Sequence, residues 1–187
     1  MFDKSCLLFS FFAITVVTDV VSYLIEIPSV TSSMVNLRRG RSLPNDTLPD
    51  KFYGSFELDH SENFDEYMIA KGYGWLTRQF VNLATFKKVF ARSVNKYLFD
   101  YSNLTSKKDI IHRKIRIGRK FIGEGLDSTK KEITFTVQRG HLFEHRKPLE
   151  KGEVGDEIYE YYFVEDWLVQ KMSYKGIEGR RFFKRYE

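Results

Sequence analysis

Cysteine and proline are scarce in this sequence. It has one cysteine, Cys6, and four prolines among its 187 residues. Cys6 lies in an apolar N-terminal segment, so a chain cut after that segment has no cysteine and must be stabilised by core packing rather than by disulfides. Four prolines and twelve glycines leave little room for a low-complexity tail. An apolar content of 42% and an aromatic content of 16% instead predict an ordered globular fold.

The short motifs of common enzyme sites are also missing. The sequence contains no G-x-S-x-G, no P-loop and no G-x-G-x-x-G after a strand pattern. Its four histidines lack metal-ligand spacing: His60, His112, His141 and His145. We therefore predict that the chain is not an enzyme and uses no metal or cofactor, although motifs do not address an active site built from dispersed residues.

Charge of one sign is not concentrated along the chain. The formal net charge is +5, and basic residues alternate with acidic ones over most of the sequence. This distribution indicates a solvated mixed surface rather than a nucleic-acid footprint. We expect no nucleic-acid partner, and a transient contact with anionic membranes stays open.

The N-terminus has the pattern of a secretory signal peptide. An apolar run from Cys6 to Val17 follows Lys4 and is short for a transmembrane helix. Small residues at Val20 and Ser22 suit signal peptidase, which predicts a signal peptide at residues 1–22 and a secreted, extracellular chain. An uncleaved signal anchor is the alternative.

Residues 23–51 differ in composition from the rest and predict a flexible leader or linker. Ser, Thr and Pro are frequent, and residues 37–41 form a basic cluster that ends at Arg41. Cleavage after Arg41 is one possibility and an intact solvated linker is the other. Two glycosylation sequons begin at Asn45 and Asn103, and the sequence does not decide whether either carries a glycan.

From residue 52 the hydrophobic pattern becomes regular. Phe64, Tyr67 and Met68 have helical spacing, and Gly72 and Gly74 separate this segment from a second short helix that begins at residue 75. Short apolar segments then indicate strands, and 133–137 alternates most cleanly. The predicted strands lie at 56–58, 89–90, 97–99, 115–117, 133–137, 142–143, 161–164 and 167–169. About ten short strands without intervening helices predict an antiparallel meander closed into a barrel.

Three segments resemble the intracellular lipid-binding protein family, which includes fatty-acid- and retinoid-binding proteins. They are G-S-F-E-L at 54–58, followed by E-N-F-D-E-Y-M at 62–68, and G-Y-G-W-L-T-R at 72–78. The resemblance covers residues 52–187. It implies an all-β fold: a ten-stranded antiparallel up-and-down β-barrel (β-clam) with a helix-turn-helix lid.

With its leader, the chain is similar to a secreted nematode group of fatty-acid-binding proteins. This implies a monomeric extracellular carrier that binds and transports long-chain fatty acids, retinoid-like lipids or related hydrophobic ligands in an internal cavity. The alternative is a secreted structural or interaction protein on the same fold, without a carrier role. Stoichiometric lipid binding discriminates between the two.

The resemblance also implies where a carboxylate binds. The family carries an Arg-x-Tyr pair on its last strand and a further arginine on an earlier one. These positions fall on Arg181, Phe183 and Tyr161 here, so one arginine is kept and one hydroxyl is lost. We predict that Arg181 is the carboxylate partner and that Tyr161 assists it. The alternative is that Arg181 is a surface residue of a basic strand.

The lid and upper cavity wall are expected to use five further residues as ligand contacts: Phe64, Tyr67, Met68, Trp75 and Thr77. Their alternative role is packing between the helices and the barrel. Met68 and Trp75 are the two that we expect to touch the ligand.

Overall fold

Ten β-strands and two α-helices make up the part of the chain that the computed structural model describes, residues 46–150 and 155–186. A short 3-10 turn at Asp50–Phe52 precedes them, and the helices are α1 (Phe64–Ala70) and α2 (Trp75–Leu83). The strands are β1 (Gly54–Glu62), β2 (Phe86–Arg92), β3 (Phe99–Thr105), β4 (Ile110–Ile115), β5 (Lys120–Glu124), β6 (Lys130–Gln138), β7 (His141–Pro148), β8 (Glu157–Val164), β9 (Trp167–Tyr174) and β10 (Ile177–Tyr186). The predicted signal peptide, Arg41 and Asn45 lie outside the described residues.

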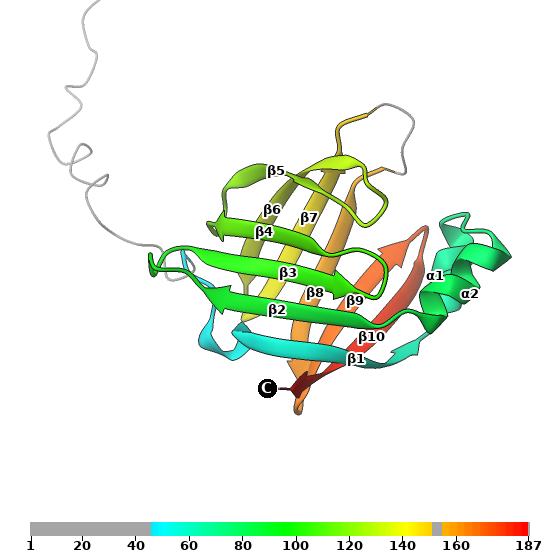
Figure 1. Ribbon diagram of the computed structural model, residues 1–187, viewed down its shortest axis with the longest axis horizontal. Helices are drawn as coiled ribbons and strands as arrows, with labels where there is room; N and C mark the ends of the chain where they lie inside the picture. The colour runs from blue at the N-terminus through cyan, green and yellow to red at the C-terminus, as the bar shows by residue number, and fades with distance from the viewer. Residues whose placement is uncertain (1–45, 151–154, 187) are drawn as a thin grey trace, which may run out of the picture. The chain divides into compact units, whose positions relative to one another are not determined.

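The strands form one antiparallel sheet in the order β4-β3-β2-β1-β10-β9-β8-β7-β6-β5. Neighbours in sequence are neighbours in the sheet, and the pairing of β1 with β10 curls it into a nearly closed barrel (Figure 1). β4 and β5 form its two edges and meet through side chains, because the rings of His112 and Phe121 lie 5.2 Å apart. The predicted β-clam fold with its two-helix lid is confirmed.

Aromatic side chains form much of the buried core, and the 3-10 turn that carries Phe52 lies at the end of the barrel opposite the helices (Figure 1). Phe52 packs against Phe90 and Phe163, with ring centroids 6.3 Å and 5.5 Å away. Leu48 is also buried in this core, although it precedes residue 52, where the sequence placed the start of the barrel domain. Side chains therefore close this end, and the space that remains lies toward the lid.

The lid is seated on β10 through α1. Asn63 precedes α1 in a left-handed conformation, and its side chain donates a hydrogen bond to the carbonyl of Glu178 at 2.6 Å. Tyr67 and Met68 are the buried residues of α1, whereas α2 has none. Neither these helices nor any other helix of the described chain is long and apolar enough to span a membrane.

Two predicted strands differ from the structure: the one at 115–117 overlaps β4 only at Ile115, and another begins later than expected. The segment 97–99 has an apolar pattern, but β3 starts at Phe99. The side chain of Asn95 accepts a hydrogen bond from the Tyr97 backbone at 2.9 Å, and its carbonyl accepts one from Leu98 at 2.9 Å. This asparagine-centred turn holds the two apolar residues in the hairpin loop.

Candidate functional site

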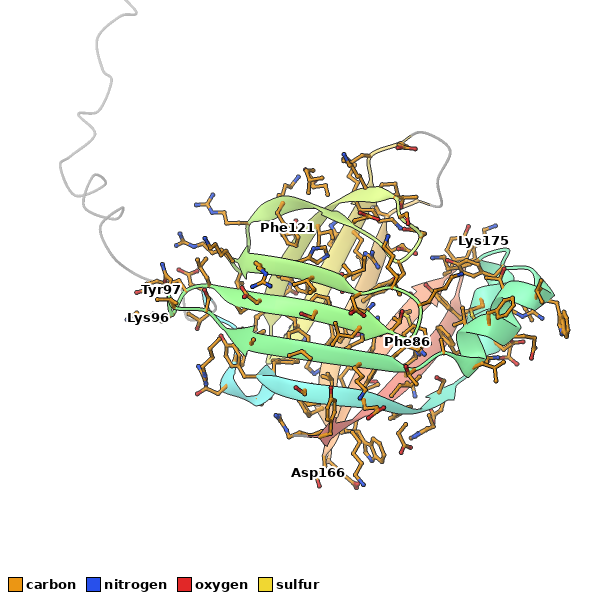
Figure 2. The ribbon with its side chains drawn as sticks, in the orientation of Figure 1. Phe86, Lys96, Tyr97, Phe121, Asp166 and Lys175 are labelled. Atoms are coloured by element: carbon orange, nitrogen blue, oxygen red, sulfur yellow. The ribbon has the colours of Figure 1, made fainter. Side chains whose placement is uncertain are left out.

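A cavity of about 420 Å³ lies between the lid and the barrel interior. This volume is within the range of roughly 300–1,000 Å³ that is typical of ligand pockets. Side chains of α1, α2 and most strands line it. Figure 2 shows Phe86 at the helix end of β2, whereas Lys96 and Tyr97 lie at the far end of the next hairpin. The cavity therefore occupies the lid half of the barrel.

Most of the site residues predicted from the sequence lie on the wall of this cavity. They are Arg181, Tyr161, Phe64, Tyr67, Met68 and Thr77. Phe183 is fully buried in the aromatic core, outside the cavity lining. The structure thus brings six of the eight together, and ligand binding by each stays a prediction.

Trp75 does not line the cavity, contrary to the expectation that it touches ligand. Its side chain is 66% exposed, whereas Thr77, two residues later, faces the cavity. Two residues correspond to about 200° around a helix, so Trp75 and Thr77 lie on opposite faces of α2. Trp75 therefore belongs to the outer surface of the lid.

Arg181 is a buried cation without a carboxylate partner among the described residues. It is 7% exposed, and its Nε atom lacks a hydrogen-bond partner within the described chain. Its guanidinium lies between two rings, 4.6 Å from the centroid of Phe64 and 3.8 Å from that of Phe86. Burial lowers the pKa of Arg181 to about 10, so it remains charged at neutral pH. Its forked donors are available to an incoming anion.

A second set of polar side chains, from β7 and β8, forms a hydrogen-bonded network in the cavity wall. Tyr161 donates a 2.7 Å hydrogen bond to Glu144, and the Nε of Arg146 lies 3.6 Å from the other oxygen of that carboxylate. Arg146 also donates to the hydroxyl of Tyr159 at 3.4 Å. Burial raises the pKa of Tyr161, and the charge of Glu144 adds to this effect. Tyr161 is therefore a neutral donor already engaged by a protein carboxylate.

Lys88 on β2 is a further cationic residue of the cavity wall. It is 3% exposed, and its Nζ lies 3.0 Å from the Tyr101 hydroxyl. The side-chain oxygen of Asn103 accepts a further, long bond from it at 3.5 Å. The half-buried Asn103 side chain thus lines the cavity.

A buried ion cluster ties the lid to the barrel. Lys71, which follows α1, pairs with Glu157 on β8. Lys131 on β6 contacts the same carboxylate at 3.5 Å and that of Asp127 at 3.0 Å. Burial raises the pKa of Glu157, but the charge and hydrogen bond of Lys71 more than offset this and leave it below the usual value. The cluster fixes the end of α1 against the barrel.

Sequence reasoning missed Lys88, Glu144 and Arg146. A signal was present in the alternation of β7, because Glu144 and Arg146 lie on the same face as the apolar Leu142. Charged residues at inward-facing positions of a barrel strand indicate a polar cavity. Within the described chain, no group of three or more histidine, cysteine or acidic side chains gathers to hold a metal.

A ten-stranded antiparallel barrel with a two-helix lid and a polar internal cavity defines a class of small lipid-binding proteins. No protein-family model matches the sequence. The chain is 69% identical over 138 residues to fatty acid-binding protein homolog 2 of Caenorhabditis elegans, which covers 74% of this chain and 86% of the relative. It is 43% identical to the fatty acid-binding protein homolog of Ascaris suum, over 74% of this chain and 86% of that one.

Among solved structures, the chain is similar to As-p18, an extracellular fatty acid binding protein. The TM-score is 0.71 at 43% identity, and the match covers 75% of this chain and 99% of As-p18. The chain belongs to the fatty-acid-binding protein family.

Proposed function

We propose that this protein is an extracellular carrier that binds long-chain fatty acids or related hydrophobic ligands in its cavity, with the ligand carboxylate on Arg181. The observation that carries the proposal is the Arg181 guanidinium, buried in the cavity wall without a carboxylate partner in the described chain. Burying a ligand carboxylate without a partner costs several kcal/mol. An arginine that is already desolvated removes most of that cost.

The remainder of the wall suits an acyl chain. Met68, Val81 and Met172 offer flexible or branched apolar surface, and Phe64 and Phe86 flank the cation. Each methylene that leaves water contributes roughly 0.8 kcal/mol. The tail therefore supplies the driving force, and Arg181 selects an ionised head group.

The test compares a fatty acid with the fatty alcohol of equal length. Replacing Arg181 by Gln removes the charge-assisted bonds, which is worth roughly 2–3 kcal/mol, or about a thirty- to hundredfold weaker Kd for the acid. The alcohol should lose much less. Arg180→Gln is the matched control, because Arg180 is exposed on the opposite face of β10 and pairs with Glu178.

Displacement of a fluorescent fatty acid measures all four combinations of variant and ligand. Equal losses for acid and alcohol in Arg181→Gln would show that this residue acts through folding or packing. Absence of stoichiometric binding to the wild type would favour the structural or interaction protein instead.

Export is the part of the proposal that rests on residues 1–22, outside the described chain. Its support is the signal-peptide pattern together with the similarity to As-p18, which is extracellular. N-terminal sequencing of protein secreted by a eukaryotic host should start at or after Tyr23. Membrane-bound protein that retains Met1 would contradict export.

Transient membrane contact is proposed to occur through the outer face of the lid. The two helices carry five exposed large apolar side chains: Ile69, Trp75, Leu76, Phe80 and Leu83. An apolar patch of this kind on a soluble domain marks an interaction surface. Because Phe80 also lines the cavity, contact of these helices with a bilayer would place lipid next to the cavity wall.

A further inference from the structure

Lys88 is a buried amine that faces the cavity without a carboxylate partner in the described chain. Its two hydrogen-bond acceptors, the hydroxyl of Tyr101 and the amide oxygen of Asn103, are both neutral. Aromatic rings surround its Nζ atom, with the centroids of Tyr161 and Phe183 at 5.5 Å and 5.2 Å. The carrier function proposed above uses Arg181 and leaves this amine without a role.

A second buried lysine of the cavity wall has a different environment. Lys131 contacts the carboxylates of Asp127 at 3.0 Å and Glu157 at 3.5 Å, which stabilise its ammonium form. Lys88 has no such contact within ion-pair distance among the described residues. The two side chains share their depth of burial and differ in the charge of their neighbours.

The electrostatics of the cavity favour the neutral form of Lys88. Burial lowers its pKa to about 7, the charge of Glu144 on β7 works against this, and the cations Arg181 on β10 and Arg146 on β7 add to it. At pH 7 roughly half of the Lys88 side chains are therefore neutral amines, compared with fewer than about one in a thousand for an exposed lysine. A neutral amine is the nucleophilic form of lysine.

The other titratable groups around Lys88 do not stabilise its ammonium form near neutral pH. Burial raises the pKa of Tyr101 on β3 and of Tyr161 on β8, so both stay neutral. Burial also lowers the pKa of His112 on β4, whose ring centroid lies 6.4 Å from that of Tyr101. Tyr101 and Tyr161 are thus neutral neighbours of the amine, and the charges that act on it are those of Glu144, Arg146 and Arg181.

We propose that Lys88 captures long-chain lipid aldehydes as a reversible imine inside the cavity. The proposal rests on the proposed function, since the same cavity must first take up the apolar chain. The Nζ lone pair attacks the aldehyde carbon and forms a C–N bond, while one of the two protons of the nitrogen passes to the carbonyl oxygen. The C–O bond of the resulting carbinolamine then breaks, and the hydroxyl leaves as water with the remaining proton of the nitrogen, which leaves a C=N bond. Amine and aldehyde thus give imine and water, with no oxidant or reductant.

The surroundings of Lys88 suit each part of this step. The Tyr101 hydroxyl, 3.0 Å from Nζ, can exchange a proton with the nitrogen as the bond forms. Burial limits the access of bulk water, which slows hydrolysis of the imine. A fatty acid cannot follow this route because its carboxylate is not electrophilic, so Lys88 extends the ligand range of the cavity to aldehydes.

The test uses the full chain, freed of lipid, with hexadecanal and cyanoborohydride to trap the imine. We expect one reduced hexadecyl group per wild-type molecule, located by peptide mapping on Lys88. Lys88→Arg and Lys88→Met should each abolish this adduct, and Lys131→Arg should keep it. The initial rate should rise about tenfold per pH unit below pH 7 and level off above it.

Fatty-acid displacement in the same samples separates this inference from the proposed function. Fatty-acid binding without an adduct on Lys88 would overturn the inference alone, as would adducts spread equally over surface lysines in wild type and Lys88→Arg. Failure to bind both fatty acid and hexadecanal would overturn the proposed function and the inference with it. Circular dichroism confirms that each variant is folded.

Discussion

Gly179 on β10 offers a direct way to loosen the lid without touching the ligand. A Cβ atom added there would lie 2.9 Å from the Cβ of Tyr67, 3.3 Å from the carbonyl oxygen of Asn63 and 3.4 Å from the Cα of Phe64. Two of these atoms are backbone, so α1 as a whole must shift. The backbone angle of Gly179 is not in the left-handed region, and alanine adds no local strain there.

Gly179→Ala should therefore destabilise lid docking by an amount typical of overpacking, about 1–3 kcal/mol. This corresponds to roughly a five- to hundredfold shift from docked to undocked lid. Barrel secondary structure should survive, since β10 keeps its pairing with β1 and β9. If ligand leaves through the lid, its dissociation rate should rise by a similar factor.

Stopped-flow release of a fluorescent fatty acid measures the dissociation rate, and hydrogen exchange of the α1 amides measures docking. Gly74→Ala is the matched control, because a Cβ added at Gly74 meets nothing within 4 Å. Faster exchange in α1 with unchanged release would show that ligand leaves by another route. Unchanged exchange would contradict the close seating of α1 on Gly179.

Three further substitutions probe the lid surface, the ion cluster and the cavity amine. Trp75→Ser should change the free energy of unfolding by less than about 0.5 kcal/mol, because the side chain is exposed, yet weaken binding to phospholipid vesicles in a flotation assay. Glu157→Gln leaves Lys71 and Lys131 without their shared carboxylate, so urea unfolding should show a loss of about 3 kcal/mol at pH 7. Because the pKa of Glu157 is lowered in the folded protein, the stability that its carboxylate contributes is complete above about pH 4.3, the unfolded pKa. This contribution is lost as pH falls through the pKa of the folded protein. The stability of Glu157→Gln should lack that decrease. For Lys88→Met the expected change in stability has the opposite sign. The Lys88 amine has a pKa of about 7 in the folded protein and about 10.4 in the unfolded chain, so it destabilises the wild type most at or below pH 7. The stability gained by Lys88→Met should therefore be largest there and shrink toward pH 10. A gain that does not vary with pH would show that Lys88 is not titrating in the barrel.

The barrel and its lid could be predicted because both helices and most of the strands carry a local signal. Ile133, Phe135 and Val137 alternate with polar residues, and all three are buried in β6. The short strand β5, at Lys120–Glu124, was not predicted, because it is an edge strand with only one buried residue, Gly123. Its place depends on pairing with β6, which is a tertiary effect.

The site could be predicted only in part. The family resemblance placed Arg181 at the carboxylate position of the last strand, and its side chain is buried there. Whether Arg181 has a carboxylate partner depends on the side chains that face it across the cavity, and the sequence pattern does not identify those side chains. The pairing of Glu144 with Tyr161 likewise depends on the register between β7 and β8. The outward position of Trp75 could have been predicted from the sequence, because helical periodicity places it on the face opposite Thr77.

The ionisation of a bound fatty acid is the most direct measure of the role proposed for Arg181. The carbon-13 NMR shift of a carboxyl-labelled palmitate reports the charge of its head group as pH is varied. Paired with Arg181 in the cavity, the carboxylate should stay ionised down to about pH 4 in wild type and in Arg180→Gln. In Arg181→Gln the same signal should titrate at a higher pH, because burial without a cation favours the neutral acid. Identical titration in all three proteins would contradict a carboxylate held by Arg181.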